Sequence, residues 1–457
     1  MQTTHSSRKS QPSAVFWRRL LGVALALRLV VALGLLGSMP LVSDAVAYAD
    51  QARQILAAFP GAEAYYRPPG LPYLLALLYA AFGDGLPVSR MAAVLISVLN
   101  VAMTTRVAGC VLRDARAVRA TGWLAAVYPP AVLMAGQPYA QPLELLCVLL
   151  ALYLLCRARQ RGRAAYAMPA ALAFGYGCLT RPGLLVAGVA LVGVWVLWLW
   201  RHARTSPEAA RRVGGGGLVF GLIVLACLVP PASHNARQGA GWTVSTNNER
   251  NLFLGNNPYT PHYKTSLFSA RPLDTLPPEV SGYLRRFLER EDARQAMLAE
   301  VRRYVAAHPW ITLRRTLNRI RAFWGFDYVM ARRIQMHFGW GTAGLMPVLL
   351  LEGGGYVAVM LLVLIGFFGS DAWRRPRGRL LIVLVLAYQL PYALAFATGT
   401  YHFTAMALLL PFAGAALAGR HGWSGLRDNR RLWVAVAVFL AIQAEYLVHT
   451  LIHSPAP

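Results

Sequence analysis

Long apolar runs alternate with short arginine-rich segments along almost the whole chain. Runs close to the roughly 20 residues that a helix needs to cross a bilayer recur from Leu20–Leu36 near the start to Leu432–Leu447 near the end. The basic segments between them lie at residues 8–19, 106–119, 157–163, 201–212, 374–379 and 420–431. Because cytoplasmic loops of membrane proteins are enriched in Lys and Arg, placing all six inside predicts about eleven spans and a cytoplasmic N-terminus.

The same placement predicts which segments lie on the opposite, external side of the membrane. They are residues 39–69, 136–139, 180–182, 232–342 and 398–402. Two apolar segments, 70–83 and 88–108, then separate an external loop from an internal cluster, although only an odd number of spans can do so. Since the first is only 14 residues long and carries Pro72 near its start, we expect 70–83 to enter the bilayer without spanning it.

This pattern divides the chain into four parts. We expect residues 1–14 to form a cytoplasmic tail and 15–231 to form an N-terminal transmembrane catalytic module that includes the external loop 39–69. Residues 232–342 are expected to form an external loop with amphipathic interfacial helices, and 343–457 the C-terminal transmembrane helices. The predicted fold is all-α and polytopic, with about 11–12 transmembrane helices.

Two external segments have the pattern of amphipathic helices rather than of spans. Residues 45–59 place Tyr48, Ile55 and Phe59 on one helical face, with polar residues elsewhere. In the stretch 310–326, apolar residues alternate with four arginines at helical spacing. Basic and aromatic residues on one helix suit a segment that lies in the lipid headgroup region.

Composition supports a membrane protein and argues against other classes. Hydrophobic residues make up 56% of the chain and charged residues only 14%, whereas soluble domains carry about a quarter charged residues. The net charge of +26 does not indicate a nucleic-acid partner, because the arginines cluster between apolar spans. The five cysteines lie in or beside apolar segments without a CxxC pair, so we expect neither a disulfide framework nor a cysteine metal site.

Several short motifs occur in an order and spacing that are typical of one superfamily. They are SDAVAYADQA after the first span, YYRPPGLPYLLALLYAAFG followed by Arg90, LTRP at 179–182, RQGAGWTVSTNNERNLFLGNNP, AHPWITLRRTLNRIRAFW and TGTYHFTAMALLLP. In these motifs the chain resembles the GT-C glycosyltransferases. The resemblance is to the lipid-carrier-dependent branch, which includes protein O-mannosyltransferases and the aminoarabinose transferases that act on lipid A.

The resemblance implies a catalytic carboxylate in the first external loop, at the position of Asp44. It also implies a sugar donor carried on a polyprenyl phosphate and transfer on the outer face of the membrane. The chain departs from the family pattern, because Ala45 follows Asp44 where a second acid is often found, and Thr400 stands where a late arginine is common. These departures weaken the expected carboxylate set, so no cofactor and no metal ligand is assigned, and a divalent cation stays open.

Asp44 and Arg67 each have a functional and a structural interpretation. Asp44 stands with Ser43 at a helix start, where either residue would cap free N–H groups, and a base for a hydroxyl or amine nucleophile is compatible with that role. Arg67 precedes two prolines that fix its backbone. Its guanidinium is suited to bind a lipid phosphate bidentately, or to snorkel at the interface.

Further candidates lie beside later external turns. Arg181 is costly next to a membrane unless it is paired or solvated, so it is a candidate for phosphate binding, with helix-turn structure as the alternative. Glu144 is a candidate second acid. The other candidate substrate-binding residues, each with a structural alternative, are Tyr66, His402, Arg315 and Arg319.

These features predict a multi-pass inverting glycosyltransferase of the bacterial inner (plasma) membrane, with an extracytoplasmic active site. Its expected partners are a polyprenyl-phosphate-linked sugar, a lipid-linked or cell-envelope glycan acceptor and membrane lipids, and no nucleic acid. The acceptor follows from the lack of a large soluble domain in the pattern. The alternatives are a flippase or transporter of lipid-linked glycan, and an inactive GT-C-like partner subunit.

Overall fold

Helices form all the regular structure in the computed structural model, which describes residues 12–161, 164–203, 205–262, 272–290, 292–419 and 426–453. The predicted all-α fold is therefore confirmed for the described residues. Eight helices in this part of the chain are long and apolar enough to cross a membrane. The protein is thus a multi-pass membrane protein, as the alternation of apolar runs and arginine clusters predicts.

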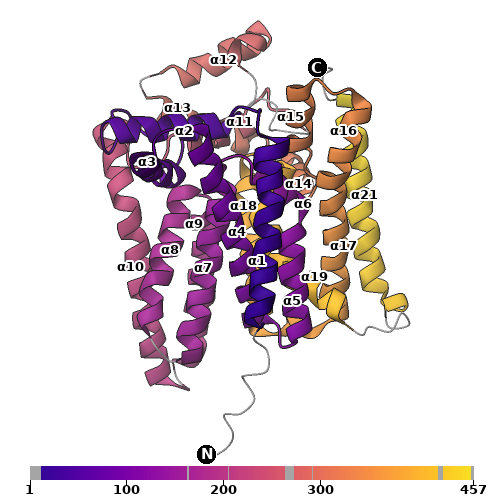
Figure 1. The fold of residues 1–457 in the computed structure, drawn as a ribbon. Coiled ribbons are helices and arrows are strands. Elements are labelled where there is room, and N and C mark those ends of the chain that lie inside the picture. The colour runs from indigo at the N-terminus through magenta and orange to yellow at the C-terminus, as the bar shows by residue number, and fades with distance from the viewer. Residues whose placement is uncertain are drawn as a thin grey trace, which may run out of the picture.

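The long helices stand side by side and form an upright bundle (Figure 1). In chain order the bundle contains α1 (Ala14–Leu29) continued by η2 (Val30–Leu35), α4 (Leu86–Val111), α5 (Ala115–Val127), α6 (Pro129–Met134), α7 (Ala140–Arg161), α8 (Ala167–Thr180), α9 (Leu184–His202), α10 (Pro207–Arg237), α16 (Thr342–Leu349) continued by η6 (Leu350–Gly354) and α17 (Gly355–Gly369), α18 (Pro376–Leu394), α19 (Phe403–Ala418) and α21 (Arg430–His453). The shorter helices α1, α5 and α8 run parallel to the long ones.

A second set of helices gathers at one end of this bundle, drawn at the top of Figure 1, and we call this end the loop face. The set comprises α2 (Asp44–Ala57), α3 (Gly70–Phe82), α11 (Asn247–Gly255), α12 (Pro278–Leu288), α13 (Ala293–Ala307), α14 (Pro309–Phe323) and α15 (Val329–Phe338). Helix α3 has 13 residues. At 1.5 Å per residue it rises about 20 Å, less than the hydrocarbon thickness of about 30 Å, which agrees with the expectation that 70–83 does not span.

Close approach of helices in the bundle depends on small residues. A Cβ on Gly366 of α17 would lie 1.8 Å from the carbonyl oxygen of Phe412 in α19. A Cβ on Gly414 of α19 would lie 2.0 Å from Oγ1 of Thr121 in α5. Side chains larger than hydrogen cannot fit at either crossing. Helix packing inside membranes commonly uses such small residues, and here they place α19 at the centre of the bundle.

The amphipathic segments form helices close to their predicted bounds, but α14 buries two arginines and exposes several apolar residues. Trp310, Leu313 and Leu317 are exposed, whereas Arg315 and Arg319 are each only 1% exposed. The arginines at this i, i+4 spacing therefore lie on the buried face of the helix. The sequence pattern predicted the helix, but it did not indicate that these two arginines lie on its buried face.

Candidate active site

The segment that enters α2 places Asp44 at the loop face. Asp44 is the first residue of the helix, and its side chain is 39% exposed. Ser43, at the cap position, makes no side-chain capping hydrogen bond and has φ 56° and ψ −126°. The capping role expected for Ser43 is therefore not seen, and the carboxylate of Asp44 contacts a distant residue instead.

Arg67 is that partner. Its Nη2 lies 2.8 Å from Oδ1 of Asp44. Gln51 lies two turns further along the same face of α2. It fixes the main chain of Arg67, because its Nε2 donates to the Arg67 carbonyl at 3.0 Å and its Oε1 accepts from the Arg67 amide at 3.2 Å. Burial acts to lower the pKa of Arg67, but the nearby Asp44 carboxylate and tyrosines outweigh it and raise that pKa. Two sequence candidates 23 residues apart thus form one ion pair.

Arg181 lies in a second polar cluster, below two tyrosine rings. Its guanidinium carbon is 4.9 Å from the centre of the Tyr401 ring and 5.4 Å from that of Tyr392. Its Nε lies 3.9 Å from Oε2 of Glu144. The charges of Asp44, Arg67 and Arg181 all act on the buried Tyr48 of α2. Tyr48 therefore lies close to both the Asp44–Arg67 pair and the Arg181 cluster.

Glu144 is completely buried and lies behind Arg181. Its Oε2 accepts hydrogen bonds from the hydroxyls of Tyr388, at 2.8 Å, and Thr404, at 3.2 Å. These contacts are thus with α18, with α19 and with Arg181, which directly follows α8. This geometry suits a residue that orients Arg181 better than one that contacts a substrate.

Sequence reasoning did not identify Arg333 of α15. Its guanidinium carbon lies 5.5 Å from the centre of the Tyr139 ring. Burial lowers the pKa of Arg333, while the charges of Asp44 and Glu352 act in the opposite direction. Arg333 follows a second arginine, Arg332, in a short amphipathic helix, so no local pattern distinguishes it from a solvated basic residue.

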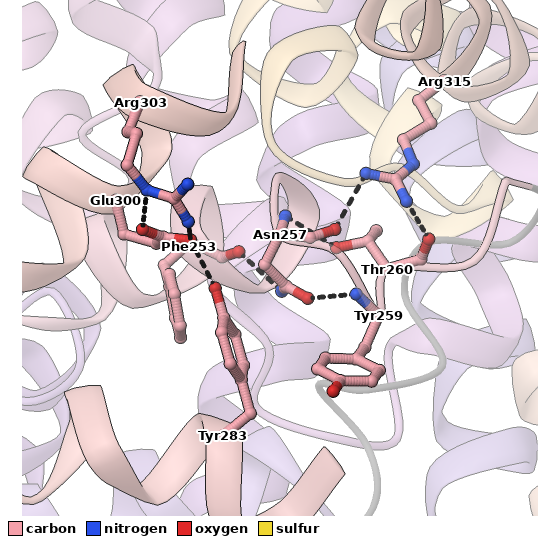
Figure 2. A network of polar contacts seen from close by, with 8 residues as sticks. All are labelled: Phe253, Asn257, Tyr259, Thr260, Tyr283, Glu300, Arg303 and Arg315. Carbon is pink, nitrogen blue, oxygen red and sulfur yellow. Dashed lines mark hydrogen bonds and ion pairs between the residues drawn. The ribbon is translucent and has the colours of Figure 1, made fainter. Parts of the chain in front are cut away.

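Arg315 and Arg319 are brought to a different place. Arg315 donates to the carbonyl oxygens of Asn257, at 3.0 Å, and Thr260 (Figure 2). Arg319 donates to the carbonyl oxygens of Gly255 and, at 2.8 Å, Leu394. Burial lowers the pKa of Arg315, and it lowers the pKa of Arg319 to about 10. Both guanidinium groups are thus used to hold the turn that follows α11.

That turn belongs to a wider polar network of the loop face. The Asn257 side chain donates to the Phe253 carbonyl at 2.9 Å, and its oxygen accepts from the Tyr259 amide at 2.9 Å (Figure 2). Glu300 accepts from the Tyr283 hydroxyl at 2.6 Å and pairs with Arg303 at 2.6 Å. The turn at Asn256–Asn257 thus ties α11 to α14, and the Tyr283–Glu300 contact ties α12 to α13.

Tyr66 and His402 have clearly different surroundings. Tyr66 is 40% exposed, and its hydroxyl accepts a hydrogen bond from Arg250 at 2.6 Å. His402 is 3% exposed, stacks on the Tyr356 ring at a centroid distance of 4.1 Å and contacts the Phe323 carbonyl through Nδ1 at 2.8 Å. Tyr66 is therefore accessible beside Arg67, whereas His402 is packed inside the protein.

The residues of the described chain do not fit a divalent cation at this site. Among them, no group of three or more His, Cys, Asp or Glu side chains lies close enough to hold a metal ion. Asp44 is paired with Arg67, and Asp50 on the same helix is paired with Arg53 at 2.6 Å. Hard divalent cations require several oxygen ligands, and the chemistry next to Asp44 is cationic instead.

Comparison with known proteins gives one family match and several structural matches. The family model described as dolichyl-phosphate-mannose-protein mannosyltransferase matches residues 66–233, less than half of the chain. The apo crystal structure of the Archaeoglobus fulgidus oligosaccharyltransferase matches with a TM-score of 0.52 at 14% identity, over 94% of this chain and 54% of that one. The search among curated proteins gives no match.

Two further structures are similar to this chain. The oligosaccharyltransferase AglB from Archaeoglobus fulgidus, in complex with an inhibitory peptide and a dolichol-phosphate, matches with a TM-score of 0.50 at 14% identity, over the same shares of the two chains. ArnT from Cupriavidus metallidurans in the apo state matches with a TM-score of 0.38 at 16% identity, over 87% of this chain and 76% of that one.

This chain spans just over half the length of the oligosaccharyltransferase structures that it matches, and at such identity the likeness concerns the fold. The family match covers the segment that carries Tyr66, Arg67, Glu144 and Arg181. Asp44 lies outside that segment. The partial family match and the shared fold together confirm the resemblance that the motifs predict: this chain has the fold of the GT-C superfamily of lipid-carrier-dependent glycosyltransferases.

Proposed function

We propose that this protein is an inverting glycosyltransferase that takes a sugar from a polyprenyl-phosphate donor. Transfer takes place on the extracytoplasmic face of the inner membrane, to a lipid-linked or cell-envelope glycan acceptor. The observation that carries the proposal is the contact of Asp44 with Arg67 at 2.8 Å beside Arg181. One carboxylate and two guanidinium groups meet at the loop face of a membrane bundle with the GT-C fold.

The proposed chemistry assigns one bond change to each charged group. A hydroxyl or amine of the acceptor attacks the anomeric carbon, and its proton passes to the Asp44 carboxylate. The bond between that carbon and the phosphate oxygen breaks, and the electron pair leaves with the polyprenyl phosphate. Fixed positive charge stabilises the negative charge that grows on this oxygen in the transition state, and Arg67 and Arg181 supply it.

The resting ion pair suggests how donor binding prepares the base. Arg67 is 23% exposed and Asp44 39% exposed, so an incoming phosphate has access to the guanidinium. A planar guanidinium binds phosphate bidentately, and we propose that Arg67 turns part of its hydrogen bonding from Asp44 to the phosphate. Asp44 then has an oxygen free for the acceptor proton.

The other sequence candidates take supporting roles in this proposal. Glu144 orients Arg181 from behind, and the exposed Tyr66 offers a ring to the sugar beside Arg67. His402 supports the packing of α14 against α17. Arg315 and Arg319 hold the loop face together through main-chain carbonyls. No step in the proposal uses a metal ion, because the described side chains near Asp44 do not form a set of oxygen ligands.

The test is transfer of labelled sugar from synthetic polyprenyl-phosphate donors by the purified full-length protein, with an envelope lipid and glycan extract as acceptor. A panel of hexose and pentose donors identifies the sugar. Asp44→Asn keeps the size of the side chain and removes the base, and we expect transfer to fall by about 10²- to 10⁴-fold.

Asp50→Asn is the matched control, because Asp50 lies on the same helix and its partner is the exposed Arg53. It should transfer sugar at the wild-type rate. Equal rates for wild type and Asp44→Asn would show that Asp44 is not the base. Movement of the donor across vesicles without transfer would favour a flippase, and absence of transfer with every donor would favour an inactive partner subunit.

A further inference from the structure

The backbone just before Asp44 has an unusual conformation. Ser43 has φ 56° and ψ −126°, and within the described ranges no other residue except glycine has a positive φ. These angles match the first central position of a type II′ turn, which glycine normally occupies. The Ala45 amide donates to the Val42 carbonyl at 3.2 Å and closes the turn. A side chain therefore stands where the backbone favours a residue without one.

The segment that leads into this turn is held by two buried side chains, one from α4 and one from the loop between α6 and α7. Arg90 of α4 donates to the carbonyl oxygens of Gly37, at 2.7 Å, and Met39. Gln137 donates to the Pro40 carbonyl at 3.1 Å. Arg90 is 3% exposed and Gln137 0% exposed. The carbonyl oxygens of Gly37, Met39 and Pro40 thus all accept hydrogen bonds before the chain reaches Ser43.

Close packing at the start of the segment adds a third restraint. A Cβ on Gly136 would lie 2.3 Å from Cδ1 of Leu36, so the Leu36 side chain packs directly against that glycine. Leu36 and Met39 are 0% and 1% exposed. The chain from Leu36 to Pro40 therefore has little freedom to shift along the surface of α4 and relax the turn that follows it.

We infer that Arg90 is a positioning residue, which holds residues 37–40 so that Ser43 keeps its unfavourable backbone angles and the Asp44 carboxylate faces Arg67. Strained backbone persists only where the surrounding structure determines it, and it is concentrated at functional sites. The buried guanidinium of Arg90 donates to two carbonyl oxygens of this one segment. The inference rests on the proposed function for the role of Asp44, but the mechanical coupling can be measured without it.

The first experiment measures that coupling through thermal unfolding of the purified protein in detergent. Ser43→Gly relieves the strain and is expected to raise the Tm, and Arg90→Gln releases the segment and is expected to lower it. If Arg90 works against the strain at Ser43, Arg90→Gln must lower the Tm by less in the Ser43→Gly background. Additive Tm changes would overturn the inference.

Arg315→Gln is the matched control for this double-mutant cycle, because Arg315 is also a buried arginine bound to main-chain carbonyls. Its Tm change should be the same with and without Ser43→Gly. If Arg90→Gln does not fold, Gln137→Leu removes the Pro40 contact instead, and it must show the same non-additivity with Ser43→Gly.

The second experiment measures the effect on transfer. Ser43→Gly should lower kcat about tenfold with the donor KM nearly unchanged, since a small misplacement of a reacting group reduces rate more than binding. Ser38→Gly adds similar freedom within the same segment at a residue with negative φ, and it should lower kcat by less. An equal kcat for Ser43→Gly and wild type would overturn the link to Asp44. Failure of the wild type to transfer any sugar would instead refute the proposed function and leave the Tm result standing.

Discussion

Two pairs of arginines lie at the loop face, and their partners are of opposite kinds. Arg67 and Arg181 pair with carboxylates, and their side chains are 23% and 16% exposed. Arg315 and Arg319 are each 1% exposed and donate to main-chain carbonyls, as Figure 2 shows for Arg315. A main-chain carbonyl is a fixed partner, whereas a side-chain carboxylate can release a guanidinium to an incoming phosphate. The partner therefore distinguishes a structural arginine from a candidate ligand for an anion.

Among these four arginines, we expect Arg181→Gln to cause the largest loss of sugar transfer. Loss of a preformed positive charge at the leaving group should lower sugar transfer by about 10²- to 10³-fold. The Tm should also fall, because the fully buried Glu144 loses its neighbouring cation, so turnover is expressed per folded molecule. Initial rates with a labelled polyprenyl-phosphate donor, together with thermal unfolding, measure both quantities. A large Tm loss with unchanged turnover per folded molecule would place Arg181 in the structural pair.

The structural pair should behave in the opposite way. Arg319→Gln leaves the Gly255 carbonyl without its guanidinium donor and removes one of the two donors to the Leu394 carbonyl, the other being Asn256. A buried, unsatisfied polar group costs about 1–3 kcal/mol. We expect a Tm several degrees lower and a nearly normal transfer rate for the molecules that remain folded. Arg302→Gln, at an exposed position of α13, is the control for removing one positive charge. A wild-type Tm for Arg319→Gln would contradict the assignment.

The fold was largely predictable because its signals are local. Apolar length, arginine placement and helical period indicated the all-α bundle, the helix at 45–59 and the short apolar segment at 70–83. Contacts between distant residues were not predictable in the same way. The sequence placed Arg67 in the first external loop. Its direct contact with Asp44 requires the chain at Arg67 to return to α2, where Gln51 binds the Arg67 main chain.

The candidate residues show the same division between local and long-range information. The motif containing Arg315 and Arg319 indicated a helix, but which face they occupy depends on the carbonyls that α11 presents to them. Arg333 was not predicted as a candidate, because the residues that mark it are Tyr139 and Asp44. Both lie far from Arg333 in the sequence. A charge that is ordinary in its local sequence becomes a site residue only through tertiary contacts.

Arg67 gives an intermediate test, because it is paired to Asp44 and also offered to the donor. Arg67→Lys keeps the charge and loses the bidentate geometry, so we expect the KM for the donor to rise about tenfold with a smaller fall in kcat. Arg67→Gln should lower both kcat and affinity further. Steady-state kinetics over a range of donor concentrations separates the two parameters. A KM for Arg67→Lys equal to that of the wild type would mean that Arg67 only holds Asp44 in place.

The smallest effect on sugar transfer is expected at Tyr388, which contacts Glu144. Tyr388→Phe removes the hydroxyl that donates to Glu144 at 2.8 Å and leaves the ring in place. A single hydrogen bond contributes about 0.5–1.5 kcal/mol net, and this one reaches Arg181 only through Glu144, so transfer should fall by a few-fold. Thr404→Val removes a longer contact to the same oxygen, 3.2 Å, and should have a still smaller effect. A loss for Tyr388→Phe as large as that for Arg181→Gln would mean that Tyr388 touches the substrate itself, and the boundary between ligand and support would then lie one residue deeper in the bundle.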